Sequence, residues 1–307
     1  MPRDMSEFVA RLASPVVVAC HDAGAANLIF AWLRDWATSG LLDDYSFRLV
    51  LRGPAELEWT KLNLALPGAE IHTDLSTALQ GANSVLTGTG WASTLEHDAR
   101  KLASALNMRN IAAVDHWVNY HQRFERGHEV VLPEEIWVAD PYAAEIAGRL
   151  FEGVRVLELS NNYLQEEVKN IPTPPEDSRT ILYLLEPLRM DWGRGTPGEF
   201  QALDFFAEQL HLVGGSQPLE VVLRPHPSDP VHKYDDWIKN HPNLSIKLDQ
   251  GTSLSQAIGR ARWVVGAETF AMVVAVAAGR QTYSSLPPWA HRCRLPHKEI
   301  VHLSDLS

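Results

Sequence analysis

The stretch Val221-Val-Leu-Arg-Pro-His-Pro-Ser-Asp229 joins an apolar run to a polar end that is rich in proline. The first part predicts a short buried β-strand, and the second predicts a loop that follows it. Pro225 and Pro227 each fix their own φ and restrict the residue before them, so we expect a stiff loop. A stiff loop that carries Arg224 and His226 at the end of a strand is suited to bind a phosphate or a carboxylate. The alternative is a structural turn in which the histidine only completes a hydrogen bond.

Short apolar runs alternate with helical patterns on both sides of this stretch. The runs are rich in β-branched residues and apolar throughout, which is typical of parallel strands that are buried on both faces. Strand–helix alternation of this kind predicts a parallel sheet that is covered by helices. In the first half of the chain we expect strands at residues 16–20, 47–51, 69–72, 84–87, 111–114, 136–139 and 154–159, and helices at 25–38, 55–65, 75–80, 94–106 and 142–150.

The same pattern restarts after a proline-rich segment, residues 171–178, which indicates a linker or a surface crossover. The chain of 307 residues is long enough for two domains with their own cores. We therefore predict an α/β protein with two Rossmann-like domains that face each other across a cleft, 1–165 and 166–307. In the second half we expect strands at 181–185, 219–224, 244–248, 263–265 and 281–285, and helices at 199–211, 232–239, 253–261 and 269–278.

The composition argues against several classes of partner. The formal net charge is −11 and no cluster of Lys and Arg stands out, so neither nucleic acid nor an anionic membrane surface is expected. No stretch of about 18 apolar residues predicts a membrane span, and the apolar run at 15–20 is too short for a signal peptide. Cys20 and Cys293 form no disulfide framework or metal-binding pattern, and they fit a reducing cytoplasm. No His, Asp or Glu spacing indicates a metal site.

The loop after the first predicted strand carries His21 and Asp22. Gly24 keeps side chains away from the backbone at the start of the next helix, where a ligand can approach. A histidine and a carboxylate at this point offer a base for a hydroxyl group that has to lose its proton. The alternative is that Asp22 or Asn27 caps the helix.

A glycine-rich loop follows the strand predicted at 84–87. Gly88 and Thr89 are candidates to line a substrate site, although a bare Gly-x-Gly is a weak signal. Ser93 and Glu96 have the spacing of a capping box, so we expect these two residues to be structural.

The loop after the strand at 111–114 carries Asp115, His116, Trp117 and Asn119. Polar and aromatic side chains in this mixture are typical of sugar sites, where aromatic faces and fixed hydrogen-bonding groups suit a polyhydroxylated ring. The alternative is a packed turn with Trp117 in the core.

A fourth loop, Gly266-Ala-Glu-Thr269, lies between a strand and an apolar helix. The N terminus of that helix can present backbone N–H groups and Thr269 to a phosphate. Glu268 either caps the helix or binds a ribose. We expect the apolar helix to be buried and to stop at Gly279.

Two Rossmann-like halves, the His226-Pro227 motif and the arrangement of residues 263–279 resemble the GT-B glycosyltransferase superfamily. Within it, the chain resembles His-Pro-motif enzymes: bacterial sialyltransferases that use CMP-sialic acid, and CDP-glycerol glycerophosphotransferases, in which Arg-Pro-His-Pro also recurs. UDP-N-acetylglucosamine 2-epimerases share the architecture. The chain departs from this pattern in its sequence: Asp22-Ala-Gly24 only approximates the acidic pair of the sialyltransferases, and Ala267-Glu-Thr269 replaces a Ser/Thr pair. In addition, Val273 or Val274 stands where a helix acid often grips the ribose, unless Glu268 substitutes from the loop.

The resemblance implies a cytoplasmic, metal-independent glycosyltransferase of surface-polysaccharide assembly, with a nonulosonic acid among the candidate sugars. Its partners would be a nucleotide-sugar and a glycan acceptor, and it would need no cofactor beyond the donor substrate. The base would be Asp22 or His21. Donor-binding residues would be Arg224, His226, Gly266, Glu268 and Thr269; acceptor- or sugar-binding residues would be Gly88, Thr89, Asp115, His116 and Asn119.

Two other functions fit the same residues. An NDP-sugar 2-epimerase or hydrolase would use Asp22, Asp115 and His116 as acid/base groups on the sugar. A non-catalytic protein that binds a nucleotide-sugar would use the same loops without turnover.

Overall fold

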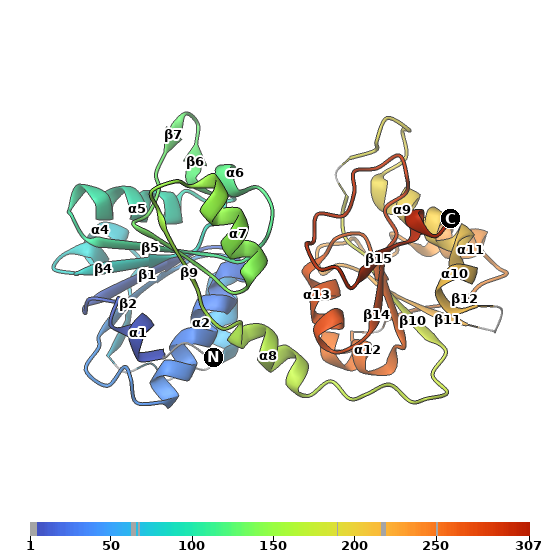
Figure 1. Cartoon of the computed structure of the whole chain (residues 1–307), viewed down its shortest axis with the longest axis horizontal. Coiled ribbons are helices and arrows are strands. Elements are labelled where there is room, and N and C mark those ends of the chain that lie inside the picture. The colour runs from blue at the N-terminus through green and yellow to red at the C-terminus, as the bar shows by residue number, and fades with distance from the viewer. Residues whose placement is uncertain (1–4, 63–65, 67, 189, 216–218, 250) are drawn as a thin grey trace. The chain divides into compact units, whose positions relative to one another are not determined.

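The computed structural model describes residues 5–62, 66, 68–188, 190–215, 219–249 and 251–307. The chain divides into two compact units, Met1–Tyr163 (unit 1) and Leu164–Ser307 (unit 2). The division falls in α8 (Asn162–Lys169), the helix in which the predicted domain boundary also lies. Each unit has a parallel sheet of its own with helices packed against it (Figure 1). The prediction of an α/β chain with two Rossmann-like domains is confirmed.

The sheet of unit 1 has seven strands in the order β3-β2-β1-β4-β5-β8-β9, and all of its pairs are parallel. The order runs outward from β1 in both directions, as in Rossmann folds. The chain therefore changes direction across the sheet between β1 and β4. The strands are β1 (Val16–Cys20), β2 (Phe47–Leu51), β3 (Ala69–Ile71), β4 (Ser84–Thr87), β5 (Arg109–Val114), β8 (Glu135–Val138) and β9 (Arg155–Glu158).

Alternate residues of β1 enter two different cores, because successive side chains of a strand point to opposite faces. Val16 and Val18 pack with Ile29 and Leu33 of α2, whereas Val17 and Ala19 pack with residues of α4 and α5. Figure 1 shows α2 and α5 on opposite faces of this sheet. The helices of unit 1 are α1 (Met5–Val9), α2 (Ala23–Thr38), α3 (Pro54–Leu62), α4 (Leu75–Leu79), α5 (Leu95–Ala105), α6 (Tyr120–Phe124) and α7 (Pro141–Leu150), with a hairpin of β6 (Glu125–Arg126) and β7 (Glu129–Val130).

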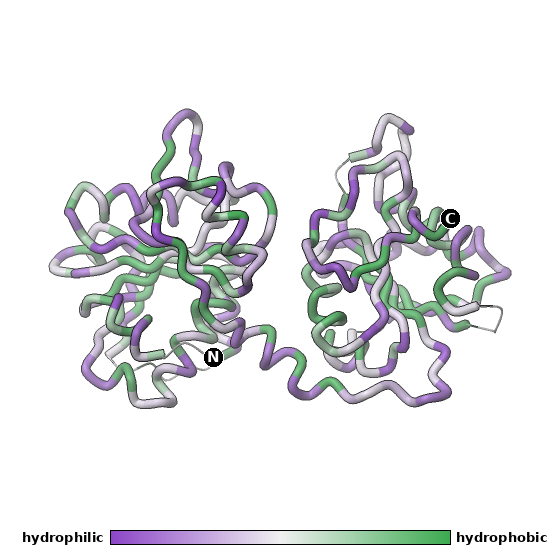
Figure 2. The backbone as a smooth tube through the Cα atoms, in the orientation of Figure 1, coloured by the Kyte–Doolittle hydropathy of each residue, from purple (hydrophilic) through white to green (hydrophobic). Residues whose placement is uncertain are grey.

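The sheet of unit 2 has six parallel strands in the order β12-β11-β10-β13-β14-β15, so it reverses between β10 and β13. Apolar positions are concentrated on the central strands of both units (Figure 2). The strands are β10 (Thr180–Leu184), β11 (Glu220–Arg224), β12 (Ser245–Leu248), β13 (Trp263–Gly266), β14 (Gln281–Ser284) and β15 (Ile300–His302). The helices are α9 (Gly198–Glu208), α10 (Leu210–Gly214), α11 (Asp235–Asn240), α12 (Leu254–Arg260), α13 (Phe270–Ala277) and the 3₁₀ turn η1 (Leu303–Asp305).

Several elements differ from the prediction. The helix expected at 199–211 is two helices, α9 and α10, that meet at Gln209. The helix expected at 232–239 begins at Asp235, since His232 has a φ of +69° and is not helical. The helix expected at 55–65 is described only as α3, and residues 63–65 lie outside the described residues. β15 was not expected. The apolar helix α13 is buried along its middle, at Met272–Ala275, and less buried at both ends; it stops before Gly279 at φ +73° as predicted.

Among the described residues, no helix combines the length and the apolar character that crossing a bilayer requires.

Candidate functional site

Topology marks one edge of each sheet as the place for a ligand. In open α/β sheets, ligands bind beyond the carboxyl ends of the strands where the strand order reverses. In unit 1 that point lies between β1 and β4, and in unit 2 between β10 and β13. His21 and Asp22 follow β1 directly, and Gly266 ends β13, so the predicted loops do lie at these reversal points.

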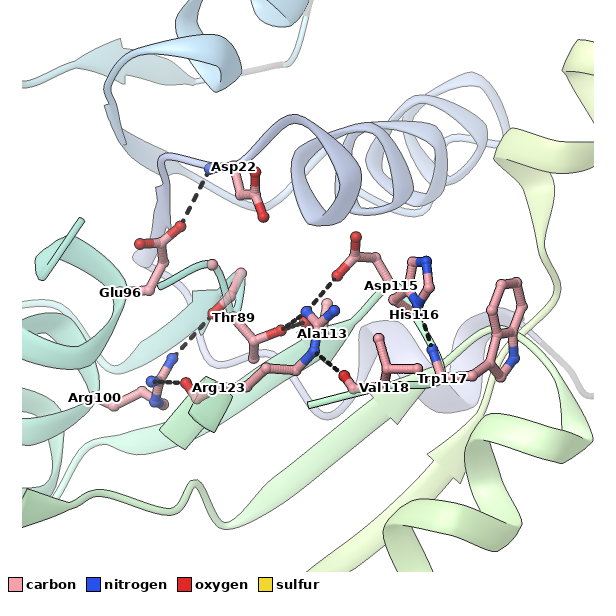
Figure 3. A network of polar contacts seen from close by, with 12 residues as sticks. Asp22, Thr89, Glu96, Arg100, Ala113, Asp115, His116, Trp117, Val118 and Arg123 are labelled. Carbon is pink, nitrogen blue, oxygen red and sulfur yellow. Dashed lines mark hydrogen bonds and ion pairs between the residues drawn. The ribbon is translucent and has the colours of Figure 1, made fainter. Parts of the chain in front are cut away.

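Glu96 organises the loop after β1. Its side chain is fully buried, and its Oε1 accepts hydrogen bonds from the backbone N–H of His21 at 2.7 Å and of Asp22 at 3.4 Å (Figure 3). The predicted capping box is therefore wrong, because the carboxylate binds the backbone at the end of β1 and does not accept from the N–H of Ser93. Ser93 accepts from the N–H of Leu95 at 3.1 Å. Burial raises the pKa of Glu96 above its ordinary value, against the lowering effect of these backbone N–H groups.

Asp22 occupies the N-cap position of α2 but makes no capping hydrogen bond with its side chain. Burial raises the pKa of Asp22, the negative charge of Asp115 raises it further, and Arg123 and His21 oppose the rise. A carboxyl group whose pKa is raised toward neutrality is suited to act as a general base. The capping alternative for this side chain is thus not what the structure contains.

Two glycines make room for the pair of carboxyl groups. A Cβ at Gly24 would lie 2.0 Å from Oδ2 of Asp115, and a Cβ at Gly90 would lie 2.6 Å from Cβ of Asp22. Neither position accepts a larger residue without displacing a carboxyl group. The loops after β1, β4 and β5 therefore meet at one place, which we call the carboxylate site: His21, Asp22, Glu96 and Asp115.

Arg123 holds Asp115 in place through an ion pair. It donates to Oδ1 of Asp115 at 2.8 Å, to Oγ1 of Thr89 at 3.2 Å and to the carbonyl of Val118 at 3.1 Å (Figure 3). Thr89 is fully buried and donates to the carbonyl of Ala113 at 3.0 Å. Thr89 thus acts through Arg123, and its role in binding a sugar stays a prediction.

The other predicted residues of unit 1 have distinct surroundings. Nδ1 of His21 is buried, and the structure gives it no hydrogen-bond partner among the described residues. His116 accepts the N–H of Trp117 at Nδ1 over 2.9 Å. Trp117 is in the core, as the alternative reading of this loop predicted, and its Nε1 donates to Asp140. Gly88 lies where a Cβ would come within 3.0 Å of Ala25, so it permits close packing of α2.

The loop that follows β11 is held by Asp229. Its Oδ2 accepts from the N–H of His226 at 2.9 Å and from the hydroxyl of Tyr234 at 3.0 Å, and its Oδ1 accepts from Lys233 at 2.7 Å. Burial alone would raise the pKa of Asp229, but these hydrogen bonds hold it below its ordinary value. The stiffness predicted from two prolines therefore also depends on a buried ionised carboxylate.

His226 is exposed and has a defined tautomer. Its Nδ1 accepts the backbone N–H of Ser228 at 3.2 Å and lies 2.7 Å from Oγ of the same residue. A backbone N–H can only donate, so the proton of the neutral ring is on Nε2. The ring thus presents an N–H donor to solvent, as an anion-binding role requires. Arg224, by contrast, binds Asp249 and donates to the carbonyl of Thr252 at 2.8 Å, which joins the ends of β11 and β12.

A second cluster of charges surrounds the loop after β13. Glu268 accepts from Nε2 of His291 at 3.0 Å and from Nε of Arg294 at 3.0 Å. Burial would raise the pKa of Glu268, but the hydrogen bonds from Arg294 and His291 keep it below its ordinary value. The N–H of Glu268 donates to Oε1 of Glu186 at 2.5 Å. Thr269 is the N-cap of α13, and its side chain makes no capping hydrogen bond.

Burial raises the pKa of Glu186 to about 7; the N–H of Glu268 opposes this rise, and the negative charge of Glu268 adds to it. Glu186 lies two residues after β10, as Asp22 lies two residues after β1.

Sequence reasoning missed several residues of these sites. Glu186 had a usable signal, because it directly follows the strand predicted at 181–185. Glu96, Arg123, His291 and Arg294 had none, since each acts through a contact with a distant part of the chain. Among the described residues, no group of three or more His, Cys, Asp or Glu is arranged to hold a metal ion.

The sequence matches no protein-family model and no curated protein. Solved structures do share its fold. The UDP-GlcNAc 2-epimerase of Methanocaldococcus jannaschii is 10% identical, with 88% of this chain and 83% of that one covered, at a TM-score of 0.55. The enzyme of that name from Neisseria meningitidis, bound to UDP-GlcNAc, is 8% identical, with 88% and 81% covered, at a TM-score of 0.56. MurG of Acinetobacter baumannii is 14% identical, with 88% and 78% covered, at a TM-score of 0.50.

These similarities define the class of fold: the chain has the GT-B fold. The expected fold is thereby confirmed, and membership of the GT-B superfamily stays a prediction. The closer likeness to His-Pro-motif transferases stays a prediction.

Proposed function

We propose that the protein is a metal-independent glycosyltransferase that moves a sugar from a nucleotide-activated donor to a glycan or glycoconjugate acceptor. One observation carries this proposal: Asp22 has a raised pKa, no capping hydrogen bond, and a neighbouring Asp115 that Arg123 holds in place. A general base for a sugar hydroxyl needs a carboxyl group of raised pKa whose side chain does not cap its own helix. The resemblance described above suggests surface-polysaccharide assembly as the setting.

We assign donor binding to unit 2. The exposed Nε2–H of His226 and the N terminus of α13 at Thr269 both suit a phosphate, which accepts hydrogen bonds and is attracted by the positive end of a helix dipole. Gly266 lets the backbone of this loop approach Met272 closely, since a Cβ there would lie 3.0 Å from its Sδ. Both carboxylate oxygens of Glu268 are used by His291 and Arg294, so we assign it the task of holding the loop.

The proposed reaction follows from these assignments. Asp22 removes the proton of the acceptor hydroxyl as its oxygen forms a bond to the anomeric carbon of the donor. The bond between that carbon and the phosphate oxygen breaks, and the nucleotide leaves with the electron pair. His226 and the start of α13 stabilise the charge that develops on the phosphate, which is the usual function of preorganised donors at a leaving group.

A second function has its own support. His21, Asp22, Glu96 and Asp115 bring four ionisable side chains together in one site, and an NDP-sugar 2-epimerase or hydrolase would need acid/base groups of this kind. Incubation with the donor alone separates the two functions. Isomerised or hydrolysed sugar in the absence of any acceptor would favour the epimerase or hydrolase, and an unchanged donor favours the transferase.

The first test is a thermal-shift panel of CMP, CDP, UDP, GDP and their sugars. A ligand at 100 times its Kd stabilises a protein by about 2.7 kcal/mol, which gives a clear shift. We expect at least one nucleotide-sugar to stabilise the protein, and His226→Ala to remove most of that shift and to lower transfer by roughly 10²–10³-fold. Nucleotide binding without any turnover would instead indicate a non-catalytic binding protein. If both His226→Ala and Asp22→Ala left transfer intact, the mechanism would be wrong.

A further inference from the structure

A cavity of about 560 Å³ lies on unit 1 beside the carboxylate site. Three segments converge on it: the loop after β4, the start of α6, and the β6–β7 hairpin. Its lining residues are Trp91, Asn119, Gln122, Glu125, Arg126 and Gly127, which we call the Trp91 groove.

Trp91 supplies an aromatic surface that is linked to the carboxylate site. The side chain is 49% exposed, which is unusual for a tryptophan within a folded unit. The guanidinium of Arg123 lies 5.2 Å from its ring centroid, and Arg123 is the residue that binds Asp115. The preceding residue is Gly90, against which Asp22 packs. The indole is therefore anchored next to the proposed base and keeps half of its surface accessible.

Three side chains of the groove have polar ends available to a ligand. No hydrogen bond of the Asn119, Gln122 or Glu125 side chain is found within the described part of the chain. Asn119 has a φ of +59° and starts α6 without capping it, so its amide is not used by the helix. Two amides and a carboxylate beside an exposed indole combine a flat apolar surface with directional hydrogen-bonding groups.

The charges of the groove disfavour an anionic ligand. The terminal nitrogens of Arg126 bond to the carbonyls of Gly90, Ser93, Gln122 and Glu125, so this cation is committed to the protein. Burial lowers the pKa of Arg126, in keeping with that environment. The guanidinium keeps its positive charge, because carbonyls are neutral, and among the described lining residues the carboxylate of Glu125 balances it. The N–H groups of its terminal nitrogens are already used, so a phosphate or a carboxylate ligand would find no free charged donor in the groove and would be repelled by Glu125.

We propose that the Trp91 groove binds a neutral pyranose ring of the acceptor glycan, stacked on Trp91 and hydrogen-bonded by Asn119, Gln122 and Glu125. The C–H face of a sugar packs on an aromatic ring, and its hydroxyls pair with amides and carboxylates. This inference rests on the proposed function for the identity of the bound ring as an acceptor. It narrows the proposed choice of acceptor to glycans with a neutral sugar in this groove. The donor, by contrast, carries the negatively charged phosphates.

The test is binding of methyl β-glucopyranoside, methyl β-galactopyranoside and methyl N-acetyl-β-glucosaminide to the full chain, by saturation-transfer NMR and calorimetry at millimolar concentration. We expect at least one to bind, and Trp91→Ala to weaken it by about 10-fold or more, with Trp91→Phe closer to the parent protein. Asn119→Gly should also weaken binding, by about 3–10-fold, while glycine suits the φ of +59° and spares the fold. Leu106→Ala, at an exposed site elsewhere on unit 1, is the matched control.

The proposal is overturned if none of the three glycosides binds, if Trp91→Ala binds as the parent does, or if methyl glucuronide binds more tightly than the neutral sugars. Nucleotide binding is measured on the same variants and should not change. If the parent protein bound no nucleotide or nucleotide-sugar, the proposed function would be wrong. Glycoside binding in the Trp91 groove is measured separately and would stand or fall by its own result.

Discussion

Units 1 and 2 each place an acid two residues after the first strand of the sheet, with a second acid beside it. The second acid comes from a different strand, since Asp115 follows β5, the fifth strand of unit 1, and Glu268 follows β13, the fourth of unit 2. The two units also use the pair differently. In unit 1, Asp22 lies beside Asp115, which Arg123 binds; in unit 2, Glu186 lies beside Glu268, which Arg294 and His291 bind. In each pair the first acid has a raised pKa. Glu186 spends an oxygen on the N–H of Glu268, whereas Asp22 makes no capping bond. The same topology thus gives one carboxyl group that is available to a substrate and one that holds a loop.

The largest expected effect is on kcat, and it should distinguish the role of unit 1 from that of unit 2. Asp22→Asn removes the proposed base and keeps its shape, so we expect kcat for transfer to fall by roughly 10²–10⁴-fold. The Kd for the nucleotide should stay within about twofold, because the change lies in unit 1, and calorimetry of the variant measures it directly. His226→Ala changes unit 2 and should have the opposite result, in which the main loss is in nucleotide binding. If Asp22→Asn had the kcat of the parent protein, Asp22 would not be the base, and the contrast between Asp22 and Glu186 would be wrong.

A smaller effect is expected at Glu96, which acts on the base through the backbone. Glu96→Ala leaves the N–H groups of His21 and Asp22 without their acceptor, so we expect kcat to fall by about 10–100-fold. Glu96→Gln keeps an oxygen in place and should recover most of the rate. Recovery by glutamine distinguishes a positioning role from proton transfer by Glu96 itself. Loss of activity in both variants, with unchanged melting temperatures, would assign the proton transfer to Glu96.

The smallest effect should appear in stability and its pH dependence in unit 2. An ordinary glutamate has a pKa of about 4.3, and that of Glu186 is about 7, so between these values the folded chain holds a proton that the unfolded chain has lost. Stability therefore falls as pH rises through this window. Glu186→Gln should remove the dependence and add about 1–2 kcal/mol at pH 8, measured by urea unfolding from pH 5 to 8. Parallel pH curves for the two proteins would show that Glu186 ionises normally.

The strands were predictable from sequence because each is a short apolar run in an alternating pattern, and β1, β2 and β4 have the expected bounds. The strand ends were predictable for the same reason. Asp22 and Asp115 follow such ends, so the sequence identifies both as candidate site residues. The partners of these residues were not. Glu96 bonds to a backbone N–H 75 residues earlier, and nothing in its local pattern distinguishes it from a helix cap. Arg224 shows the opposite case, where a residue chosen for an anion is bound by Asp249 from the next strand.

The division of the chain has a consequence for its biosynthesis. Every strand of the first sheet lies before residue 164, and every strand of the second lies after it. Domains generally fold as units during translation, N-terminal first. Unit 1 is therefore able to fold on the ribosome while unit 2 is still being synthesised. Its parallel strands, which pair across long loops and fold slowly, would be paired before a second set of similar strand edges emerges to compete for them.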